Sequence, residues 1–237
     1  MLDPPTEPAR ETTGAKGHTL VEDPTPAQRA LARRTAEARA TIPDFECSVD
    51  AELTAALASW ERAGCSLDAA LVAACSAGLR AVPRANAAYR DGRYELYSRV
   101  NVGFVVARED SYVIPTVFDA DEKTTQELSA EIERLTEAAL ARKLAPPAFS
   151  GATFTLWNAG RAGFDRATAI ISPPHAAALA AGAVREAPVI DGGELRAGQV
   201  MTLTLACDHR ILYGARAGQF LAVVRAALTT GASQPEP

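Results

Sequence analysis

Residues 203–214, with the sequence LTLACDHRILYG, decide how this chain is interpreted. The apolar run has the composition of a strand, and Gly214 leads into a run with helical spacing. Side chains alternate along an extended segment, so Asp208 and Arg210 share a face and can pair with each other or with nearby groups. His209 stands between them, and imidazole, with a pKa of about 6.5, suits a general base near neutral pH. We expect His209 to be catalytic, with Asp208, Arg210 and Gly214 supporting the site; the alternative is a structural histidine at a strand end.

Composition limits the class of protein. The chain has 237 residues, 48% hydrophobic and 22% charged, which is typical of a globular protein. A net charge of −5 argues against a nucleic-acid partner. No C-x-x-C pair or His/Cys cluster indicates a metal site, so Cys47, Cys65, Cys75 and Cys207 are expected to be reduced thiols. No apolar run reaches the roughly 18 residues of a membrane span, so a cytoplasmic location is expected by default, with no membrane partner.

The pattern predicts three regions: a flexible N-terminal arm over residues 1–24, one domain over 25–230 and a disordered tail over 231–237. The arm has no room for a further domain. Helical spacing and capping residues predict five helices. The first starts at Thr25 and Pro26, and the third in chain order is capped by Ser66. The helices after the first are expected at Ala51–Ala63, Leu67–Val82, Thr124–Lys143 and Ala215–Thr229.

Runs of β-branched and aromatic residues predict strands separated by polar turns. Asp91-Gly92 and Asp191-Gly192-Gly193 are predicted turns, the second closing a hairpin. The predicted strands include residues 94–97, 100–107, 112–117 and 199–207, and residues 41–50 lead from the first helix into a strand.

Several segments together resemble the catalytic domain of the dihydrolipoyl acyltransferases of 2-oxoacid dehydrogenase complexes, relatives of chloramphenicol acetyltransferase. The resemblance runs from about residue 26 to 228. It rests on Arg33-Arg34 with Ile42-Pro43-Asp44-Phe45, on Val100–Ala107, on Ser111–Lys123, on Gly151–Gly160, on Ser172-Pro173-Pro174-His175, and on Asp208-His209-Arg210-x-x-x-Gly214. It implies an α/β two-layer sandwich with a mixed sheet, a homotrimer with sites between subunits, and acetyl-CoA as co-substrate with no bound cofactor.

In the family, the histidine takes a proton from a thiol that attacks an acyl thioester directly, and a serine of the neighbouring subunit stabilises the oxyanion. In this chain Trp157 occupies the serine position. Thr155, two residues earlier on the same strand face, is the second candidate donor. Trp157, Asn158 and Tyr213 are expected to contact substrate. An arginine of the first helix, here Arg33 or Arg34, pairs in relatives with an acid four residues after the histidine, but Tyr213 holds that position. His175, where relatives often carry glutamine or glutamate, is interpreted as structural.

These departures leave several hypotheses. The first is a stand-alone O-acetyltransferase that resembles those of tetronate and spirotetronate antibiotic biosynthesis, with a small-molecule hydroxyl as acceptor. Large aromatic residues at positions 157 and 213 could present flat faces to a ring-shaped acceptor. The alternatives are a non-catalytic trimeric scaffold of the same fold, and an acyltransferase core of a 2-oxoacid dehydrogenase complex.

Overall fold

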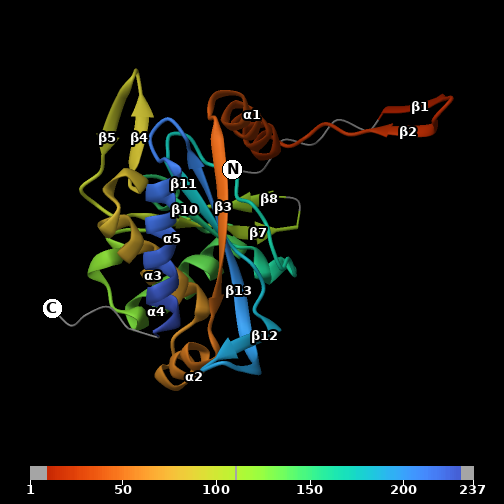
Figure 1. The fold of residues 1–237 in the computed structure, drawn as a ribbon. Coiled ribbons are helices and arrows are strands. Elements are labelled where there is room, and N and C mark those ends of the chain that lie inside the picture. Colours follow the sequence, from red (N-terminus) through yellow and green to blue (C-terminus); the bar gives the residue numbers. More distant parts are fainter. Residues whose placement is uncertain (1–9, 110, 231–237) are drawn as a thin grey trace.

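The long strand β13 (Glu194–Asp208) lies inside a seven-stranded sheet (Figure 1). The computed structural model describes residues 10–109 and 111–230. The strand order is β12-β13-β11-β10-β6-β9, and β3 pairs with β13 as well. β10 runs parallel to both β6 and β11, and the other pairs are antiparallel, so the sheet is mixed. These strands are β3 (Asp44–Glu52), β6 (Val102–Phe104), β9 (Thr116–Val117), β10 (Phe154–Asn158), β11 (Ala177–Ala181) and β12 (Arg185–Asp191).

Helices cover one face of this sheet. α3 (Leu67–Ala81), α4 (Thr125–Leu140) and α5 (Gly214–Thr229) form the second layer, and α5 crosses in front of the sheet in Figure 1. Their apolar sides meet alternate residues of the strands, among them Phe154, which stacks with Phe220 at 5.6 Å between ring centroids. The prediction of a two-layer α/β sandwich with a mixed sheet is confirmed.

The opposite face of the sheet carries small side chains. Ala178, Ala180 and Ala206 pack there with Ile42 after α1 (Pro26–Thr41) and with a short segment that precedes β11. Because strand side chains alternate, residues 155 and 157 of β10 also belong to this face.

Local signals placed most helix starts correctly. Thr25 caps α1 in a capping box with Gln28, and Ser66 caps α3 through its hydroxyl. Thr124 and Glu127 form a second capping box at the start of α4. Short 3-10 helices cover Pro83–Ala85, Ala120–Glu122, Pro146–Phe149 and Ala159–Ala162.

Several boundary predictions were wrong. The predicted strand 112–117 is divided between β8 (Ser111–Val113) and β9, and the helix predicted to end at Lys143 ends at Leu140. The second helix, α2 (Thr54–Ala63), begins three residues later than predicted, because Ala51 and Glu52 pair with β13 and prolong β3. The predicted strand 100–107 is divided into β6 and β7 (Val106–Arg108). β7 leaves the main sheet to pair with β8.

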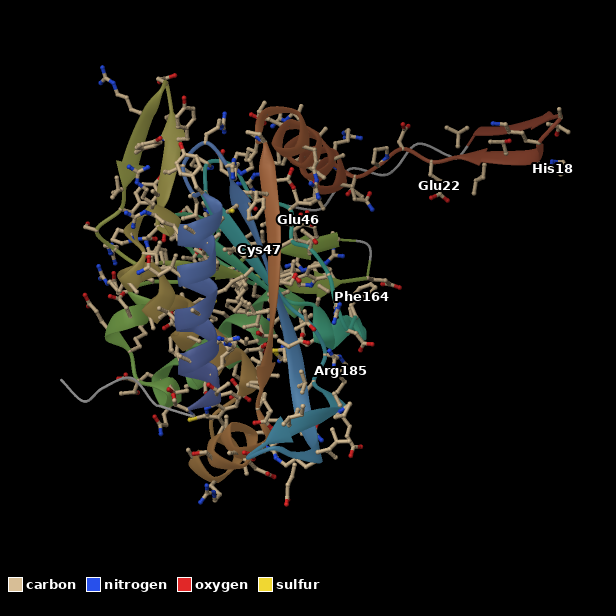
Figure 2. The ribbon with its side chains drawn as sticks, in the orientation of Figure 1. His18, Glu22, Glu46, Cys47, Phe164 and Arg185 are labelled. Atoms are coloured by element: carbon tan, nitrogen blue, oxygen red, sulfur yellow. The ribbon has the colours of Figure 1, made fainter. Side chains whose placement is uncertain are left out.

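The predicted N-terminal arm is a hairpin over its described part. β1 (Arg10–Gly14) and β2 (Gly17–Val21) pair antiparallel, and Gly17 adopts a φ of 85° at the turn. The hairpin projects away from the rest of the molecule (Figure 1), with His18 at its outer end (Figure 2). The sequence did not predict this hairpin within the arm. Residues 1–9 and the predicted tail 231–237 lie outside the described residues.

A second small hairpin, β4 (Ala87–Arg90) and β5 (Arg93–Leu96), stands at the same end of the molecule as α1 (Figure 1). Asp91 and Gly92 close it with φ of 49° and 74°, which confirms the predicted turn. The Asp191–Gly193 hairpin between β12 and β13 is confirmed too. In the described part of the chain, no helix has both the length and the apolar character needed to cross a bilayer.

Candidate functional site

His209 lies directly after β13, where two backbone hydrogen bonds fix the chain. The Asp208 amide donates to the carbonyl of Ala176 at 2.8 Å, and the His209 amide donates to that of Pro43 at 3.0 Å. The imidazole itself is exposed and makes no hydrogen bond or ion pair within residues 10–109 and 111–230. Its backbone is therefore fixed, while its ring nitrogens make no hydrogen bond among these residues.

The predicted pair of Asp208 and Arg210 is present. Arg210 donates through Nε to Asp208 Oδ1 at 2.9 Å and through Nη2 to Oδ2 at 2.7 Å, and its backbone amide also bonds Oδ1 at 3.0 Å. The Asp208 side chain is 3% exposed, while that of Arg210 is 34% exposed. The pair spans the turn that carries His209 and so fixes the backbone on both sides of it.

An aromatic strip flanks the base. It consists of Phe45, His209, Tyr213, Tyr94 and Tyr89. The imidazole lies 5.3 Å from Phe45 and 5.4 Å from Tyr213 between ring centroids, and Tyr89 lies 6.0 Å from Tyr94. The hydroxyls of Tyr94 and Tyr213 both donate to the Arg210 carbonyl, at 3.1 and 3.3 Å.

Sequence reasoning found Tyr213 but missed the rest of the strip. The available signal was the Asp91-Gly92 turn, which makes Tyr89 and Tyr94 a cross-strand pair. The adjacent Tyr94 phenol raises the pKa of the Tyr213 phenol, so that phenol stays protonated near neutral pH. His209 is thus the group of the strip suited to accept a proton. Gly214 begins α5, as predicted.

Thr155 belongs to a buried hydrogen-bonded chain with His175. Its Oγ1 lies 3.1 Å from His175 Nδ1, and His175 Nε2 lies 2.8 Å from the carbonyl oxygen of Ala152. Burial lowers the pKa of His175 to about 4, so the ring is neutral near neutral pH. A carbonyl oxygen can only accept, so Nε2 carries the proton and Nδ1 accepts from the Thr155 hydroxyl. This contact agrees with a structural role for His175.

The same contact corrects the expectation for Thr155. Its hydroxyl proton is directed to His175, and its side chain is buried, so in this geometry it has no proton to donate to an oxyanion. Sequence alternation placed Thr155 on the expected face, but it could not show which hydrogen-bond partner lay beneath it.

The structure separates Trp157 from Asn158. Trp157 is half-buried, packs on the small-residue face of the sheet and meets Phe164 edge to face at 6.0 Å. Asn158 faces the other way and donates through Nδ2 to Asp68 Oδ1 at 2.6 Å, beside the Asp68–Arg161 ion pair. Asn158 is thus engaged at the start of α3, which argues against the predicted contact with substrate.

His209 contacts neither Thr155 nor Trp157 within the described chain; its ring contacts are with Phe45 and Tyr213. Arg33 and Arg34 make no ion pair with Asp208, whose partner is Arg210. The predicted base and the predicted oxyanion position therefore do not form one site in a single copy of the described residues. No cluster of three or more potential metal ligands occurs in the same residues.

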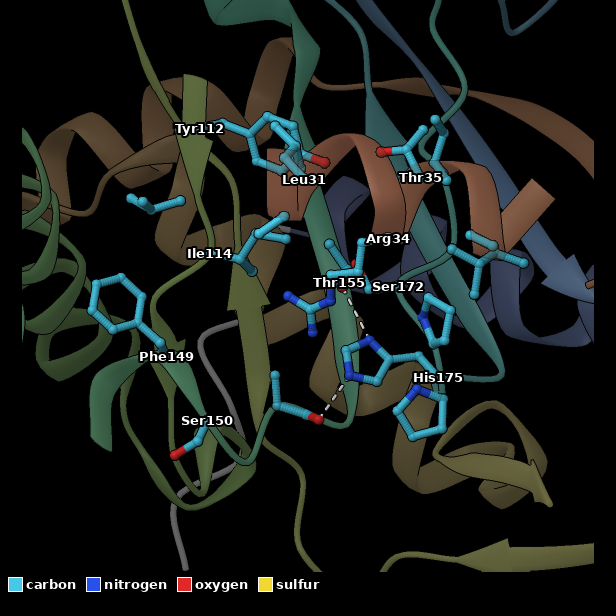
Figure 3. A pocket seen from close by; sticks show the side chains of 18 of the residues that line it. Leu31, Arg34, Thr35, Tyr112, Ile114, Phe149, Ser150, Thr155, Ser172 and His175 are labelled. Atoms are coloured by element: carbon cyan, nitrogen blue, oxygen red, sulfur yellow. Dashed lines mark hydrogen bonds between the residues drawn. The ribbon is translucent and has the colours of Figure 1, made fainter. Parts of the chain in front are cut away.

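Two cavities adjoin these residues. The larger, of about 480 Å³, lies between α1 and the segments before β10 and β11, and Thr155 and His175 line it (Figure 3). The smaller, of about 240 Å³, lies between β10 and α4 and is lined by Trp157 and Asn158.

Comparison with known proteins assigns the family. The family model described as 2-oxoacid dehydrogenases acyltransferase (catalytic domain) matches residues 17–233. The chain belongs to this family. The chain is 32% identical over 211 residues to the dihydrolipoyllysine-residue acetyltransferase component of the pyruvate dehydrogenase complex of Rhizobium meliloti, covering 84% of this chain and 47% of that protein. The corresponding component of Rickettsia bellii is 29% identical, covering 84% and 50%. The chain spans about half the length of the curated relatives it matches.

Solved structures agree with this assignment. The dihydrolipoamide acetyltransferase of Azotobacter vinelandii superimposes with a TM-score of 0.84 at 27% identity, covering 95% of this chain and 97% of that one. A chloramphenicol acetyltransferase, at 14% identity and a TM-score of 0.55, covers 83% and 94% and shares the fold. The predicted resemblance is confirmed.

The Azotobacter structure also supplies two spacings. It was solved in an investigation of the catalytic role of a serine, of a histidine 52 residues later and of an asparagine four residues after that. In this chain, His209 follows Trp157 by 52 residues and precedes Tyr213 by four.

Proposed function

We propose that this acyltransferase moves an acetyl group between CoA and the thiol of a dihydrolipoyl group, with His209 as general base. The observation that carries the proposal is the exposed, hydrogen-bond-free imidazole of His209, fixed at the end of β13 by the Asp208–Arg210 pair. The family match and the relatives of pyruvate dehydrogenase complexes favour this function over the hydroxyl acceptor that the altered site residues first indicated.

The reaction needs no acyl-enzyme. The imidazole of His209 takes the proton of the acceptor thiol, and the thiolate attacks the carbonyl carbon of acetyl-CoA. A tetrahedral oxyanion forms, the bond to the CoA sulfur breaks, and the imidazolium returns its proton to the departing thiolate. A thiol of pKa about 8.5 is a suitable acid for a neutral imidazole.

Trp157 is our candidate for the oxyanion donor. Its indole N–H makes no hydrogen bond within the described residues, whereas Thr155 already donates to His175. An indole can donate but not accept, which fits an oxyanion. Loss of one such donor typically costs about 10²–10³ in rate.

A second copy of the chain would bring these two groups together. His209 and Trp157 make no contact within one copy, and a related structure is that of the cubic core of a pyruvate dehydrogenase complex. We therefore propose a homotrimer with its sites between subunits. Size-exclusion light scattering should give about three times the 24.9 kDa chain mass; a monodisperse monomer would contradict the proposal.

A second candidate is O-acetylation of a small ring-shaped molecule, of which a tetronate is one example. The aromatic strip favours it, because Phe45 and Tyr213 offer flat faces on both sides of the base. A scaffold without activity is the third hypothesis, and the intact, positioned His209 argues against it.

Mass spectrometry of acetylated products distinguishes the candidates. The chain is incubated with acetyl-CoA and, side by side, dihydrolipoamide, a hydroxymethyl tetronate and a simple alcohol. We expect transfer to dihydrolipoamide. Transfer only to a hydroxyl compound would establish the second candidate, and transfer to none by a folded trimer would support the scaffold.

A further inference from the structure

We propose that Tyr94 of the β4–β5 hairpin is a positioning residue, whose hydroxyl holds the turn that carries His209. This role rests on the proposed function, in which His209 is the base. Tyr94 lies 116 residues before Arg210, whose carbonyl accepts its hydrogen bond, so the bond joins two separate elements. The hairpin forms a two-stranded sheet of its own, at the top of Figure 1.

The turn between β13 and α5 is held by hydrogen bonds at its amide groups. The His209 amide donates to a backbone carbonyl at 3.0 Å, and the Ile211 amide donates to the Asp208 carbonyl, also at 3.0 Å. Neither bond involves the Arg210 carbonyl. In the described part of the chain, both hydrogen bonds that this carbonyl accepts come from tyrosine hydroxyls. The downstream side of His209 therefore depends on these two phenols.

The two hydroxyls act on the turn in different ways. Tyr213 is three residues from Arg210, so its bond of 3.3 Å closes the turn on itself. Tyr94 donates at 3.1 Å from another element, so its bond ties the same carbonyl to the hairpin. A carbonyl oxygen has two lone pairs and can accept both hydroxyls. Loss of the Tyr94 hydroxyl should release the turn from the hairpin and leave the Tyr213 bond in place.

The hairpin is itself anchored, so it can serve as a fixed support. Ala87 of β4 is fully buried, and its carbonyl accepts the Ala176 amide at 2.9 Å. The Ala176 carbonyl in turn accepts the Asp208 amide at 2.8 Å, at the end of β13. Tyr89 and Tyr94 are partners across the hairpin, and their ring centroids lie 6.0 Å apart. One continuous set of contacts thus joins the end of β13 to the ring of Tyr94.

Two arginine side chains stack on these tyrosine rings. Arg84 Cζ lies 4.4 Å from the ring centroid of Tyr94, and Arg210 Cζ lies 4.6 Å from that of Tyr89. Such cation–π contacts favour one placement of each ring. Arg210 therefore meets the hairpin twice, through its guanidinium and through its carbonyl. The Tyr94 hydroxyl is the contact that acts on the backbone next to the base.

The expected effect is a loss of rate without a loss of substrate binding. A general base is effective only where its nitrogen meets the acceptor proton in the right geometry. The net weight of one hydrogen bond corresponds to about fivefold in an equilibrium constant. Tyr94→Phe, which removes only the hydroxyl, should therefore lower kcat about fivefold. The KM values for acetyl-CoA and dihydrolipoamide should stay within about twofold.

Acetyl transfer and hydrogen–deuterium exchange are measured on the full chain in its native oligomeric state. Tyr97→Phe is the matched control for Tyr94→Phe, because Tyr97 directly follows β5 and its hydroxyl makes no hydrogen bond within residues 10–109 and 111–230. Exchange in the turn needs no turnover. The Arg210 amide is bonded to Asp208 Oδ1 at 3.0 Å, so its exchange rate reports opening of the turn.

We expect Tyr94→Phe to speed exchange in the turn and to lower kcat, and Tyr97→Phe to change neither. In His209→Ala, Tyr94→Phe should not slow the residual transfer further, because the base through which it acts is gone. Equal kcat for wild type and Tyr94→Phe, equal effects of the two tyrosine substitutions, or a further fivefold loss in His209→Ala would each overturn the proposal. An inactive wild type would refute the proposed function instead, and the exchange rates would still decide whether Tyr94 holds the turn.

Discussion

Replacing His175 with glutamine should make the free energy of unfolding fall less steeply as the pH is lowered. The histidine is buried, and burial lowers its pKa to about 4 from an ordinary 6.5. Between these two values the unfolded chain binds a proton that the folded chain does not. The free energy of unfolding therefore falls as the pH falls below 6.5, and the loss is complete near pH 4.

The pKa difference sets the size of this effect. It corresponds to about 3 kcal/mol in full and to about 2 kcal/mol at pH 5 relative to pH 7.5. Glutamine offers one donor for the Ala152 carbonyl and one acceptor for the Thr155 hydroxyl, so it can replace both contacts of His175 without titrating.

Urea denaturation at pH 7.5, 6.5, 5.5 and 5.0, at one protein concentration, measures the difference between wild type and His175→Gln. Wild type should lose about 2 kcal/mol more than the variant over this range. His18→Gln is the control, because His18 lies on the exposed hairpin (Figure 2), and it should follow wild type. Parallel pH curves for wild type and His175→Gln would refute the assignment of a neutral, buried His175.

Three further substitutions test the site and the fold. Trp157→Phe, which removes the indole N–H, should lower kcat about 10²-fold, while Trp157→Ser retains most of the rate; equal rates would remove Trp157 from the oxyanion role. Asp208→Asn leaves Arg210 without a charged partner. It should lower the free energy of unfolding, measured by urea denaturation, by about 2 kcal/mol and lower kcat about tenfold. An unchanged kcat would show that the pair does not position the base. Gly182→Ala should lower the free energy of unfolding by about 3 kcal/mol, because the new Cβ would lie 1.9 Å from a backbone oxygen. Gly218→Ala is the control: its Cβ would meet open space, so the midpoint of urea denaturation should not fall.

The sequence predicted elements whose signals are local. Thr25 and Ser66 cap helices, and Asp91-Gly92 turns the chain, because each residue acts on its own backbone or that of close neighbours. The start of α2 was missed because pairing of Ala51 with β13 is a long-range contact. Tertiary pairing prevailed there over the helical spacing of the alanines.

In the site, too, local contacts were predicted and long-range contacts were missed. Asp208 and Arg210 were expected to be able to pair because they are two residues apart in an extended segment; in the structure they do pair, although Arg210 lies in the turn after β13. The hydrogen bond of Thr155 to His175 and the closure of the aromatic strip by Phe45 join residues far apart in the chain. Local patterns in the sequence carry no information about such contacts.

The most direct test of the central claim is the rate of acetyl transfer from acetyl-CoA to dihydrolipoamide by wild type and His209→Ala. Wild type should form acetyl-dihydrolipoamide, and His209→Ala, folded and of the same oligomeric mass, should be slower by about 10²–10⁴, the usual contribution of a general base. A His209→Ala variant that transfers acetyl at the wild-type rate would contradict the assignment of His209 as the catalytic base.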